Sequence, residues 1–363
     1  MSTVSSLNPV KSLFKQIYKE RNLKVLVEKF KESSAVDRFR TNISVYERTV
    51  RRLAVAKQFQ LIEEILEEQK KFRDISKEGF AVRIISLYGK VGMFDNAQKL
   101  FDEMPELKCS RTVLSFNAIL TACVNSNKLD IMEKLFRELP EVLSVEPDSF
   151  SYNIAIKGFC KMGSLESAVS MLDEMEKKGL QTDVFTFNTL LYGFYVKGRL
   201  DDGHDIWKRM EKNNVDPNIT SYKTKLLGLV SFKKLKEAAE TVDEMRKKLI
   251  KPDVFCFNYL IKGYLDDGDL EGAKFWHGEI EKSEFDPNTT TFTLLIPFAC
   301  DKGDLDFVIK LFDKVLVTNC QIDNSVLQNV VDCLIKESRD DEAKKLVELG
   351  KSNKFRQYIL KLP

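Results

Sequence analysis

Cysteine and histidine are the side chains of this sequence best suited to nucleophilic or metal chemistry, and they are few and scattered. The chain contains seven cysteines, none of which belongs to a C-x-x-C pair. Its two histidines, His204 and His277, lie outside any H-x-E or H-E-x-x-H setting. A cysteine zinc site or a disulfide framework is therefore not expected. We interpret the cysteines as reduced core residues in a reducing compartment.

The sequence also lacks the short motifs of phosphate binding and acyl transfer. It contains neither G-x-x-x-x-G-K-[ST] nor G-x-S-x-G, the turns that cradle a phosphate or expose a nucleophilic serine. The many carboxylates are spread over segments with helical patterning, where a solvated role is expected. The sequence thus predicts a binding protein rather than an enzyme, with no catalytic residue, no metal and no cofactor.

Composition and charge narrow the class of protein further. Of 363 residues, 43% are hydrophobic and 31% are charged, as in proteins that fold in water. No apolar run reaches the roughly 18 residues of a membrane-spanning helix, so no membrane partner is expected. The net charge of +2, from 57 basic and 55 acidic residues, excludes a uniformly basic nucleic-acid binder but not a segregated charge pattern.

A tandem repeat with a period of 35 residues covers nearly the whole chain. Six clear units start at Val113, and all but the first, which has one extra residue, are 35 residues long. They span 113–148, 149–183, 184–218, 219–253, 254–288 and 289–323. Less clear copies span 43–77, 78–112 and 324–358. Residues 1–42 form a basic segment with a degenerate partial repeat, and 359–363 form a short tail.

Each unit carries two apolar stripes with helical spacing. The first stripe begins with an aromatic residue at position 4 and continues at positions 7, 8 and 11 of most units. The second occupies positions 17, 20, 23, 24 and 27, and position 27 is methionine in four units. Each unit is therefore predicted to be a helix-turn-helix hairpin whose stripes belong to the core. Because one hairpin cannot bury both faces, the units must stack into an all-α protein, an α-solenoid superhelix without strands.

Glycine recurs at two positions of the unit, and each position predicts a different structural role. At position 15, glycine suits the left-handed residue that ends the first helix. At position 10 it lies inside that helix, where it costs about 1 kcal/mol relative to alanine. Because four units repeat this cost, we expect neighbouring helices to approach closely there.

The segments 149–183 and 184–218 closely resemble pentatricopeptide repeats. A tetratricopeptide unit has 34 residues and a different glycine position, whereas five of the six clear units here have 35, as in the P-type subgroup. The resemblance covers at least residues 43–358. It implies a single-stranded RNA-binding protein of plant mitochondria or, as the alternative, chloroplasts. No DNA partner is implied.

Charge segregation agrees with an RNA partner. In units 113–323, positions 1–14 hold 7 Lys/Arg and 3 Asp/Glu, whereas the remaining positions hold 20 and 31. If the first helices line one side of the solenoid, that side is mildly basic and the opposite side acidic. A single strand could follow the basic side. The alternative is an ordinary solvated charge distribution. Residues 1–42 add 9 basic and 4 acidic residues.

The resemblance also implies which residues read the bases, namely residue 5 of a unit together with its last residue. Two pairs resemble the combination that favours uridine, Asn117/Asp148 and Asn153/Asp183. Two resemble the combination that favours cytidine, Asn188/Asn218 and Asn258/Asn288, and Thr293/Asp323 resembles a guanosine pair. Lys223/Asp253 departs from the pattern, and its lysine is expected to pair with Asp253 or to contact a phosphate. Read in order, units 113 to 323 predict U-U-C-any-C-G.

Residue 2 of adjacent units is implied to sandwich each base. The candidate stacking residues are Leu114, Phe150, Phe185 and Phe255, with threonine at the other two positions. Packing between repeats is the alternative role, and the two roles can coexist. Outside the six clear units the specificity pattern fails. The residues at these positions match no combination that favours a base, namely Glu47/Lys77, Val82/Thr112 and Gln328. Pro297 should kink its helix.

Three functions remain open from the sequence. The first is a ribosomal RNA-binding component of the plant mitochondrial ribosome, which would also contact ribosomal proteins, because short P-type chains with an incomplete code resemble such components. The second is a free organellar factor that stabilises, processes or activates a transcript. The third and weakest is a peptide-binding scaffold. The deaminase of editing members needs H-x-E and C-x-x-C motifs, which this sequence lacks. Residues 1–7 show no obvious cleavable presequence.

Overall fold

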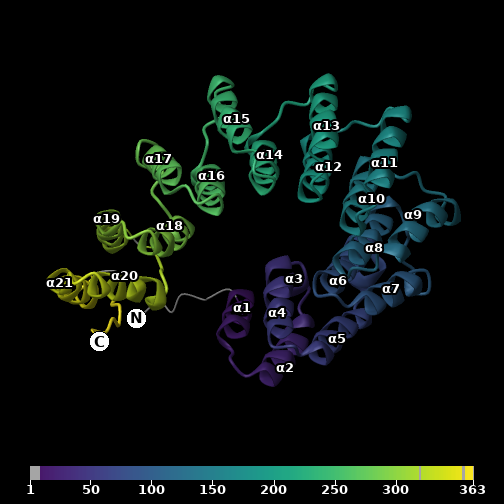
Figure 1. Cartoon of the computed structure of the whole chain (residues 1–363). Coiled ribbons are helices and arrows are strands. Elements are labelled where there is room, and N and C mark those ends of the chain that lie inside the picture. The colour runs from purple at the N-terminus through teal and green to yellow at the C-terminus, as the bar shows by residue number, and fades with distance from the viewer. Residues whose placement is uncertain (1–8, 319, 354–355, 363) are drawn as a thin grey trace, which may run out of the picture. The chain divides into compact units, whose positions relative to one another are not determined.

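The computed structural model describes residues 9–318, 320–353 and 356–362, and this part of the chain contains helices and no strands (Figure 1). Residues 1–7, in which no cleavable presequence is expected, lie outside the described residues. The chain divides into two compact units, residues 1–182 and 183–363. Each unit is a stack of antiparallel helical hairpins, which confirms the all-α class and the α-solenoid.

From residue 9 onwards, the first unit contains eleven α-helices and two short 3-10 helices. In chain order these are α1 (Pro9–Lys19), α2 (Leu23–Ser34), α3 (Asp37–Arg40), α4 (Ile43–Val55), α5 (Phe59–Glu67), η1 (Glu68–Lys71), η2 (Arg73–Ser76), α6 (Glu78–Lys90), α7 (Phe94–Glu103), α8 (Val113–Asn125), α9 (Leu129–Leu143), α10 (Ser149–Met162) and α11 (Leu165–Lys177).

The second unit contains ten α-helices within its described residues. These are α12 (Val184–Val196), α13 (Leu200–Lys212), α14 (Ile219–Ser231), α15 (Leu235–Lys247), α16 (Val254–Asp266), α17 (Leu270–Glu281), α18 (Thr289–Asp301), α19 (Leu305–Val317), α20 (Asn324–Lys336) and α21 (Asp340–Lys351). The residues of α18 stay helical on both sides of Pro297, so the proline expected to kink this helix does not end it.

The hairpin of α10 and α11 shows how the sequence starts and stops these helices. Asp148 caps α10 by accepting a hydrogen bond from the Ser151 amide, and the Ser151 hydroxyl bonds back to the Asp148 amide. This capping box satisfies amide groups that have no partner inside the helix. Gly163 then ends α10 with φ of +83°, a left-handed conformation that glycine adopts without cost. The chain reverses, and α11 begins at Leu165.

Left-handed residues at position 15 are a property of the repeat rather than of glycine alone. The predicted glycines all have positive φ, namely Gly92, Gly163, Gly198, Gly268 and Gly303. Where glycine is absent, Asn127, Lys233 and Ser338 adopt φ of 57°, 57° and 60°. The packing of each hairpin therefore imposes this turn even on residues for which a left-handed backbone costs about 1–2 kcal/mol.

The core forms where first and second helices meet. The aromatic residues at position 4 are all buried: Phe116, Tyr152, Phe187, Tyr222, Phe257 and Phe292. The four methionines at position 27 are completely buried, which confirms that this stripe belongs to the core. First helices also contact one another along each unit, as α6 with α8 and α12 with α14. This stacking buries the second apolar face that a single hairpin would expose.

Glycine at position 10 permits the close approach that the sequence predicted. A Cβ added to Gly228 on α14 would lie 2.7 Å from the Tyr195 Cβ on α12. At Gly158 it would meet the Met132 side chain at 2.3 Å, and at Gly263 the Leu235 side chain at 2.6 Å. These distances are shorter than van der Waals contact. A methyl group at Gly228 would therefore force α14 and α12 apart, whereas at Gly158 and Gly263 it would force the neighbouring side chain to move.

The N-terminal hairpins are less regular, and several of their basic residues are used internally. Arg40 is buried and forms ion pairs with Asp37 and Asp74 at 2.6 and 2.7 Å. Lys29 pairs with Glu20 at 2.5 Å. The basic excess of residues 1–42 is thus reduced by contacts inside the protein.

The described residues contain neither a membrane-spanning helix nor a cluster of metal ligands. No helix there is both long and apolar enough to cross a lipid bilayer. No group of three or more histidine, cysteine, aspartate or glutamate side chains there is arranged to hold a metal ion.

Candidate RNA interface

The predicted specificity residues occupy two fixed structural positions. Residue 5 of a unit lies in the second turn of its first helix, and the last residue of the unit is the N-cap of the next first helix. Asp148, Asp183, Asn218, Asp253 and Asn288 all accept hydrogen bonds from amides of the helix that they cap. Helix capping therefore fixes where each of these side chains points.

In the first compact unit, residues 1–182, the side chains of Asn117 and Asp148 are hydrogen-bonded to each other. The Asn117 side-chain amide donates to Asp148 Oδ1 at 3.1 Å. The Ser151 hydroxyl lies 2.6 Å from Asn117 Oδ1 and 2.9 Å from Asp148 Oδ1. Asn117 is 6% exposed. The three side chains form a triad in which the asparagine and aspartate are held side by side.

The second compact unit, residues 183–363, contains two triads of the same geometry, in which the capping residue is asparagine instead of aspartate. Asn188 donates to Asn218 Oδ1 at 3.3 Å, and the Ser221 hydroxyl lies 2.6 Å from Asn188 Oδ1. The next triad joins Asn258 to Asn288 at 3.1 Å and Thr291 to Asn258 at 2.8 Å, as the contacts of Nδ2 and Oγ1 show.

These bonds leave the two capping amides partly free. Asn218 and Asn288 face their triads through Oδ1, which also accepts the backbone amides of the helix. Within the described residues their Nδ2 groups have no hydrogen-bond partner. Each Nδ2 group can therefore donate to a ligand.

The two remaining predicted pairs are Asn153/Asp183 and Thr293/Asp323. Asp183 caps α12 through the Thr186 amide at 2.9 Å, and Asn153 is buried in the first unit. Thr293 donates to the carbonyl oxygens of Thr289 and Thr290 in its own helix. In the described part of the chain it makes no hydrogen bond to Asp323, which lacks a side-chain capping bond as well.

The departing pair, Lys223 and Asp253, forms the ion pair that was expected as one of its two roles. Lys223 Nζ lies 2.5 Å from Asp253 Oδ2 and 5.0 Å from the centre of the Phe255 ring. At position 3 of the following repeat, where the triads have serine or threonine, the chain has buried Cys256. The lysine therefore occupies the space beside both a specificity residue and a candidate stacking residue.

The candidate stacking side chains are exposed, as a ligand contact requires. Leu114, Phe150, Phe185 and Phe255 are 48%, 56%, 50% and 52% exposed. These values contrast with the buried aromatic residues two positions later in the same helices. Each lies near the N-terminus of a first helix, close in sequence to the capping residue.

Family models of pentatricopeptide repeats match this chain in tandem. The model described as PPR repeat family matches residues 111–161, 147–196, 182–231 and 252–300. A second, described as Pentatricopeptide repeat domain, matches 82–127 and 223–267. The chain belongs to the pentatricopeptide repeat family.

Relatives and solved structures agree with this assignment. The small ribosomal subunit proteins mS79 (rPPR3b) and mS78 (rPPR3a) of Arabidopsis thaliana are 60% and 61% identical over 173 and 172 residues. These matches cover 48% and 47% of this chain, which spans 44% and 43% of the two relatives. The crystal structure of the pentatricopeptide repeat protein PPR10 with an 18-nt psaJ RNA element is similar in fold, with a TM-score of 0.53 and 16% identity over 96% of this chain and 58% of that one.

No role was predicted from the sequence for the hydroxyl at position 3 of the repeat that follows each triad pair. Ser151, Ser221 and Thr291 bridge the two residues of each triad. The signal was present in the sequence, because D/N-x-x-S/T is a capping box. The specificity pattern covers only residue 5 and the last residue of a repeat, and this hydroxyl belongs to the next repeat.

Hydrogen bonding sets the charge state of the first triad. Burial opposes ionisation of Asp148, but bonds from the Ser151 amide and from the Asn117 and Ser151 side chains outweigh it. Together they hold the pKa of the Asp148 carboxyl below its usual value. At neutral pH this side chain is a carboxylate and can only accept hydrogen bonds.

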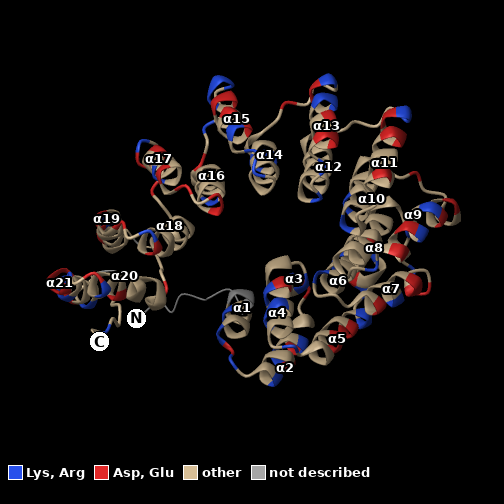
Figure 2. Ribbon diagram, viewed as in Figure 1, with Lys and Arg blue, Asp and Glu red and all other residues tan. Residues whose placement is uncertain are grey.

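The first helices are less basic than residue counts imply. Figure 2 shows α12, α14 and α16 mostly free of charge, whereas α13 and α15 carry many acidic and basic residues. Lys225 on α14 pairs with Glu244 at 3.1 Å and lies over the Trp207 ring. Lys161 on α10 donates to the Val124 carbonyl. Such lysines stabilise the stack of repeats and are only partly available to a ligand.

Repeats outside the regular array use their specificity positions for other contacts. Glu47 pairs with Lys90 at 2.6 Å, and Lys77 pairs with Asp74 at 2.8 Å. Gln328 on α20 makes two hydrogen bonds to the backbone of Lys361, at 2.8 and 2.9 Å. These residues form no triad, in agreement with the departures seen in the sequence.

Proposed function

We propose that this protein is a non-catalytic RNA-binding component of the plant mitochondrial ribosome and that its first helices bind single-stranded ribosomal RNA. The triads of Asn117/Asp148, Asn188/Asn218 and Asn258/Asn288 carry this proposal. Each presents a fixed set of polar atoms in its repeat, close in the chain to an exposed side chain. Repeat proteins that read RNA use one base per repeat in this way.

The chemistry of the capping residue supports different pyrimidines at different triads. Uracil has a donor at N3, so it suits the Asp148 carboxylate, which only accepts. Cytosine has an acceptor at N3, so it suits the free Nδ2 donors of Asn218 and Asn288. The proposed reading therefore places uridine at unit 113–148 and cytidine at units 184–218 and 254–288.

The ribosomal part of the proposal is supported by the relatives. Two proteins that are about 60% identical over nearly half of this chain are named small ribosomal subunit proteins. The irregular repeats also support it, because a chain held within a large assembly does not need an uninterrupted code. We place the protein in mitochondria on the family resemblance, with chloroplasts as the alternative.

Sedimentation of the native protein tests this proposal. A ribosomal component should migrate with the small ribosomal subunit from purified mitochondria and remain there in moderate salt. A free transcript-binding factor, which the regular triads would also suit, should instead migrate in light fractions or with messenger RNA. Recovery from chloroplasts, or resistance of the protein's migration to complete RNA digestion, would contradict the proposal.

A further inference from the structure

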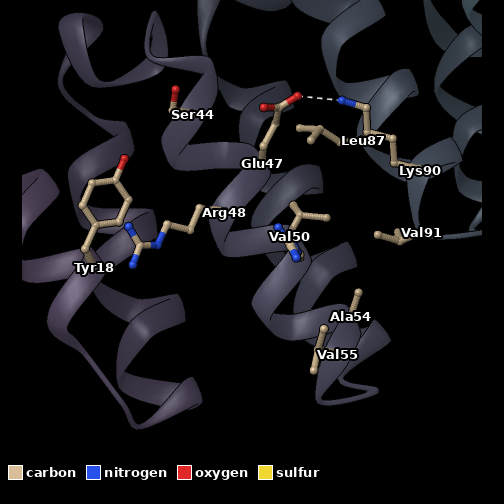
Figure 3. Close-up of a pocket in the computed structure, with 11 residues that line it drawn as sticks. Tyr18, Ser44, Glu47, Arg48, Val50, Ala54, Val55, Leu87, Lys90 and Val91 are labelled. Carbon is tan, nitrogen blue, oxygen red and sulfur yellow. Dashed lines mark hydrogen bonds and ion pairs between the residues drawn. The ribbon is translucent and has the colours of Figure 1, made fainter. Parts of the chain in front are cut away.

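A cavity of about 840 Å³ lies at the N-terminal end of the first unit, lined by residues of α1, α4 and α6 (Figure 3). Its volume is within the range of about 300–1,000 Å³ that is typical of small-molecule sites, so a nucleotide can enter it. Buried Val50 and Leu87 and half-buried Val91 contribute apolar lining. None of the triads contributes a residue to this cavity.

The outward face of α4 supplies the polar wall of this N-terminal pocket. Ser44, Glu47, Arg48 and Arg51 follow one another at helical spacing and are exposed. The opposite stripe of α4, which includes Val45, is buried. Ser44 and Glu47 are residues 2 and 5 of unit 43–77, the same helix positions that carry stacking and specificity residues in the regular repeats. The pocket thus lies on the equivalent face of an N-terminal first helix.

An aromatic ring and a guanidinium group are already stacked at one side of the pocket. The Arg48 guanidinium carbon lies 4.4 Å from the centre of the Tyr18 ring, and Figure 3 shows the arginine extending toward that ring. Arg52 holds α1 in place by donating to the carbonyl oxygens of Ile17 and Glu20, the former at 3.1 Å. Tyr18 is therefore positioned by the fold rather than by chance.

The charge of the pocket favours an anionic ligand. Its carboxylate, Glu47, is neutralised by Lys90 at 2.6 Å. The two guanidinium groups of Arg48 and Arg51 remain, and no acidic side chain is paired with either of them among the described residues. Guanidinium groups bind phosphate through two parallel hydrogen bonds and also stack on bases.

We propose that this pocket binds a nucleotide of the RNA that flanks the stretch contacted by the triads. The base stacks on the Arg48 guanidinium above Tyr18 and lies against the apolar lining, and its phosphate binds Arg48 and Arg51. This inference rests on the proposed function, because it extends the RNA path beyond the triads. A nucleotide is favoured over an acidic protein segment because the pocket combines stacking groups with phosphate ligands on the face already assigned to RNA.

Binding of two oligonucleotides to the full chain tests this inference. One is the unflanked hexamer U-U-C-A-C-G, and the other carries about four additional nucleotides at each end. Wild-type protein should bind the flanked RNA more tightly. The double variant Arg48→Gln/Arg51→Gln should bind the flanked RNA about tenfold more weakly than wild type and the hexamer equally well. The salt slope of log K for flanked RNA should fall by about 1.4, since each lost phosphate contact removes about 0.7.

A matched control separates the pocket from general charge. Arg38→Gln/Arg73→Gln removes two exposed guanidinium groups of the same unit outside the pocket and should leave both affinities unchanged. Replacing the flanks by abasic nucleotides should keep the salt slope of the wild-type protein but remove part of the affinity gain, because only the bases stack. Circular dichroism should show equal helix content in all variants.

Several results would overturn the inference. An unchanged affinity of the pocket variant for flanked RNA would do so, as would an equal loss on both oligonucleotides. Normal RNA binding with loss of co-migration with the ribosome would assign the pocket to an acidic protein partner instead. If wild-type protein binds neither RNA, the proposed function itself fails, a result that differs from loss of the flank contribution alone.

Discussion

At the residue scale, the candidate interface depends on which atoms of each triad are already used. The asparagine at residue 5 uses one side-chain amide hydrogen and its carbonyl oxygen in hydrogen bonds to neighbouring residues, as Asn117 does with Asp148 and Ser151. The hydrogen-bonding atoms that remain available to a base are mainly those of the capping residue. Substitutions at that residue should therefore change base preference more than total affinity.

Changing Asn258 to Thr together with Asn288 to Asp should move the fifth base from cytidine towards guanosine. A carboxylate accepts from the N1 and N2 donors of guanine but repels the N3 acceptor of cytosine. A swapped contact of this kind changes discrimination by about 1–3 kcal/mol. The measurement is the affinity of both proteins for two RNAs that differ only at this base. An unchanged ratio would mean that this repeat does not read the base.

Lys223 should make the fourth position indifferent to base identity, because its ion pair with Asp253 occupies the site. The double variant Lys223→Asn/Cys256→Ser gives this repeat the same three residue types as the triad of Asn117, Asp148 and Ser151. It should introduce a preference for uridine of about tenfold. Four RNAs that differ only at the fourth base measure this preference. Strong discrimination by the wild-type protein, or none by the variant, would contradict the assignment.

At the element scale, the close approach of first helices is set by small residues at defined points. Gly228→Ala should destabilise the protein by about 1–3 kcal/mol, because the new Cβ would lie 2.7 Å from the Tyr195 Cβ and overpacking has this cost. Chemical denaturation of both proteins measures the difference.

Gly278→Ala is the matched control in the same unit. Gly278 lies inside α17, and an added Cβ there has no neighbour within 4 Å. This variant should gain about 0.5–1 kcal/mol of stability from helix propensity. If both alanine variants stabilised the protein equally, close approach at Gly228 would not be the reason for its glycine.

His277 on α17 gives the second unit a defined pH response. Burial holds the pKa of this imidazole below its ordinary value of 6.5, with nearby Glu281 opposing and Lys314 adding to the effect. The unfolded chain therefore binds a proton near pH 6.5 that the folded chain does not bind. The contribution of His277 to stability should be complete above this pH and be lost as pH falls from about 7 to the folded pKa.

The variant His277→Leu tests this response. It should show a smaller loss of unfolding free energy than wild type between about pH 7 and pH 5.5, measured by urea denaturation. Identical slopes in the two proteins would assign the pH dependence to other groups.

At the scale of the whole molecule, the first helices of each compact unit present exposed side chains and, at the triads, partly free polar atoms. Such an arrangement suits bases that are unstacked from one another. The protein should therefore bind single-stranded RNA at least tenfold more tightly than a duplex of the same sequence, because pairing hides the edges that the triads would contact. Filter binding measures both affinities, and equal values would contradict the interface.

The sequence by itself determined the period, the hairpin and the class of fold. The apolar residues at positions 4 and 27 are buried, and the glycines at positions 10 and 15 have the roles that the sequence predicted. These features follow from local chemistry that is repeated in tandem. The expected Lys223–Asp253 ion pair was likewise found, since opposite charges at adjacent specificity positions have few alternatives.

Only the tertiary structure decided which polar atoms remain free. The hydroxyl that bridges each triad, the Thr293 hydroxyl turned to its own helix, and the lysines engaged by Glu244 or by carbonyl groups depend on how neighbouring helices are stacked. The N-terminal pocket likewise joins Tyr18 to α4 across residues far apart in the chain. Spacing within one repeat cannot give these contacts, because they are made between elements whose separation is set by the packing of the core.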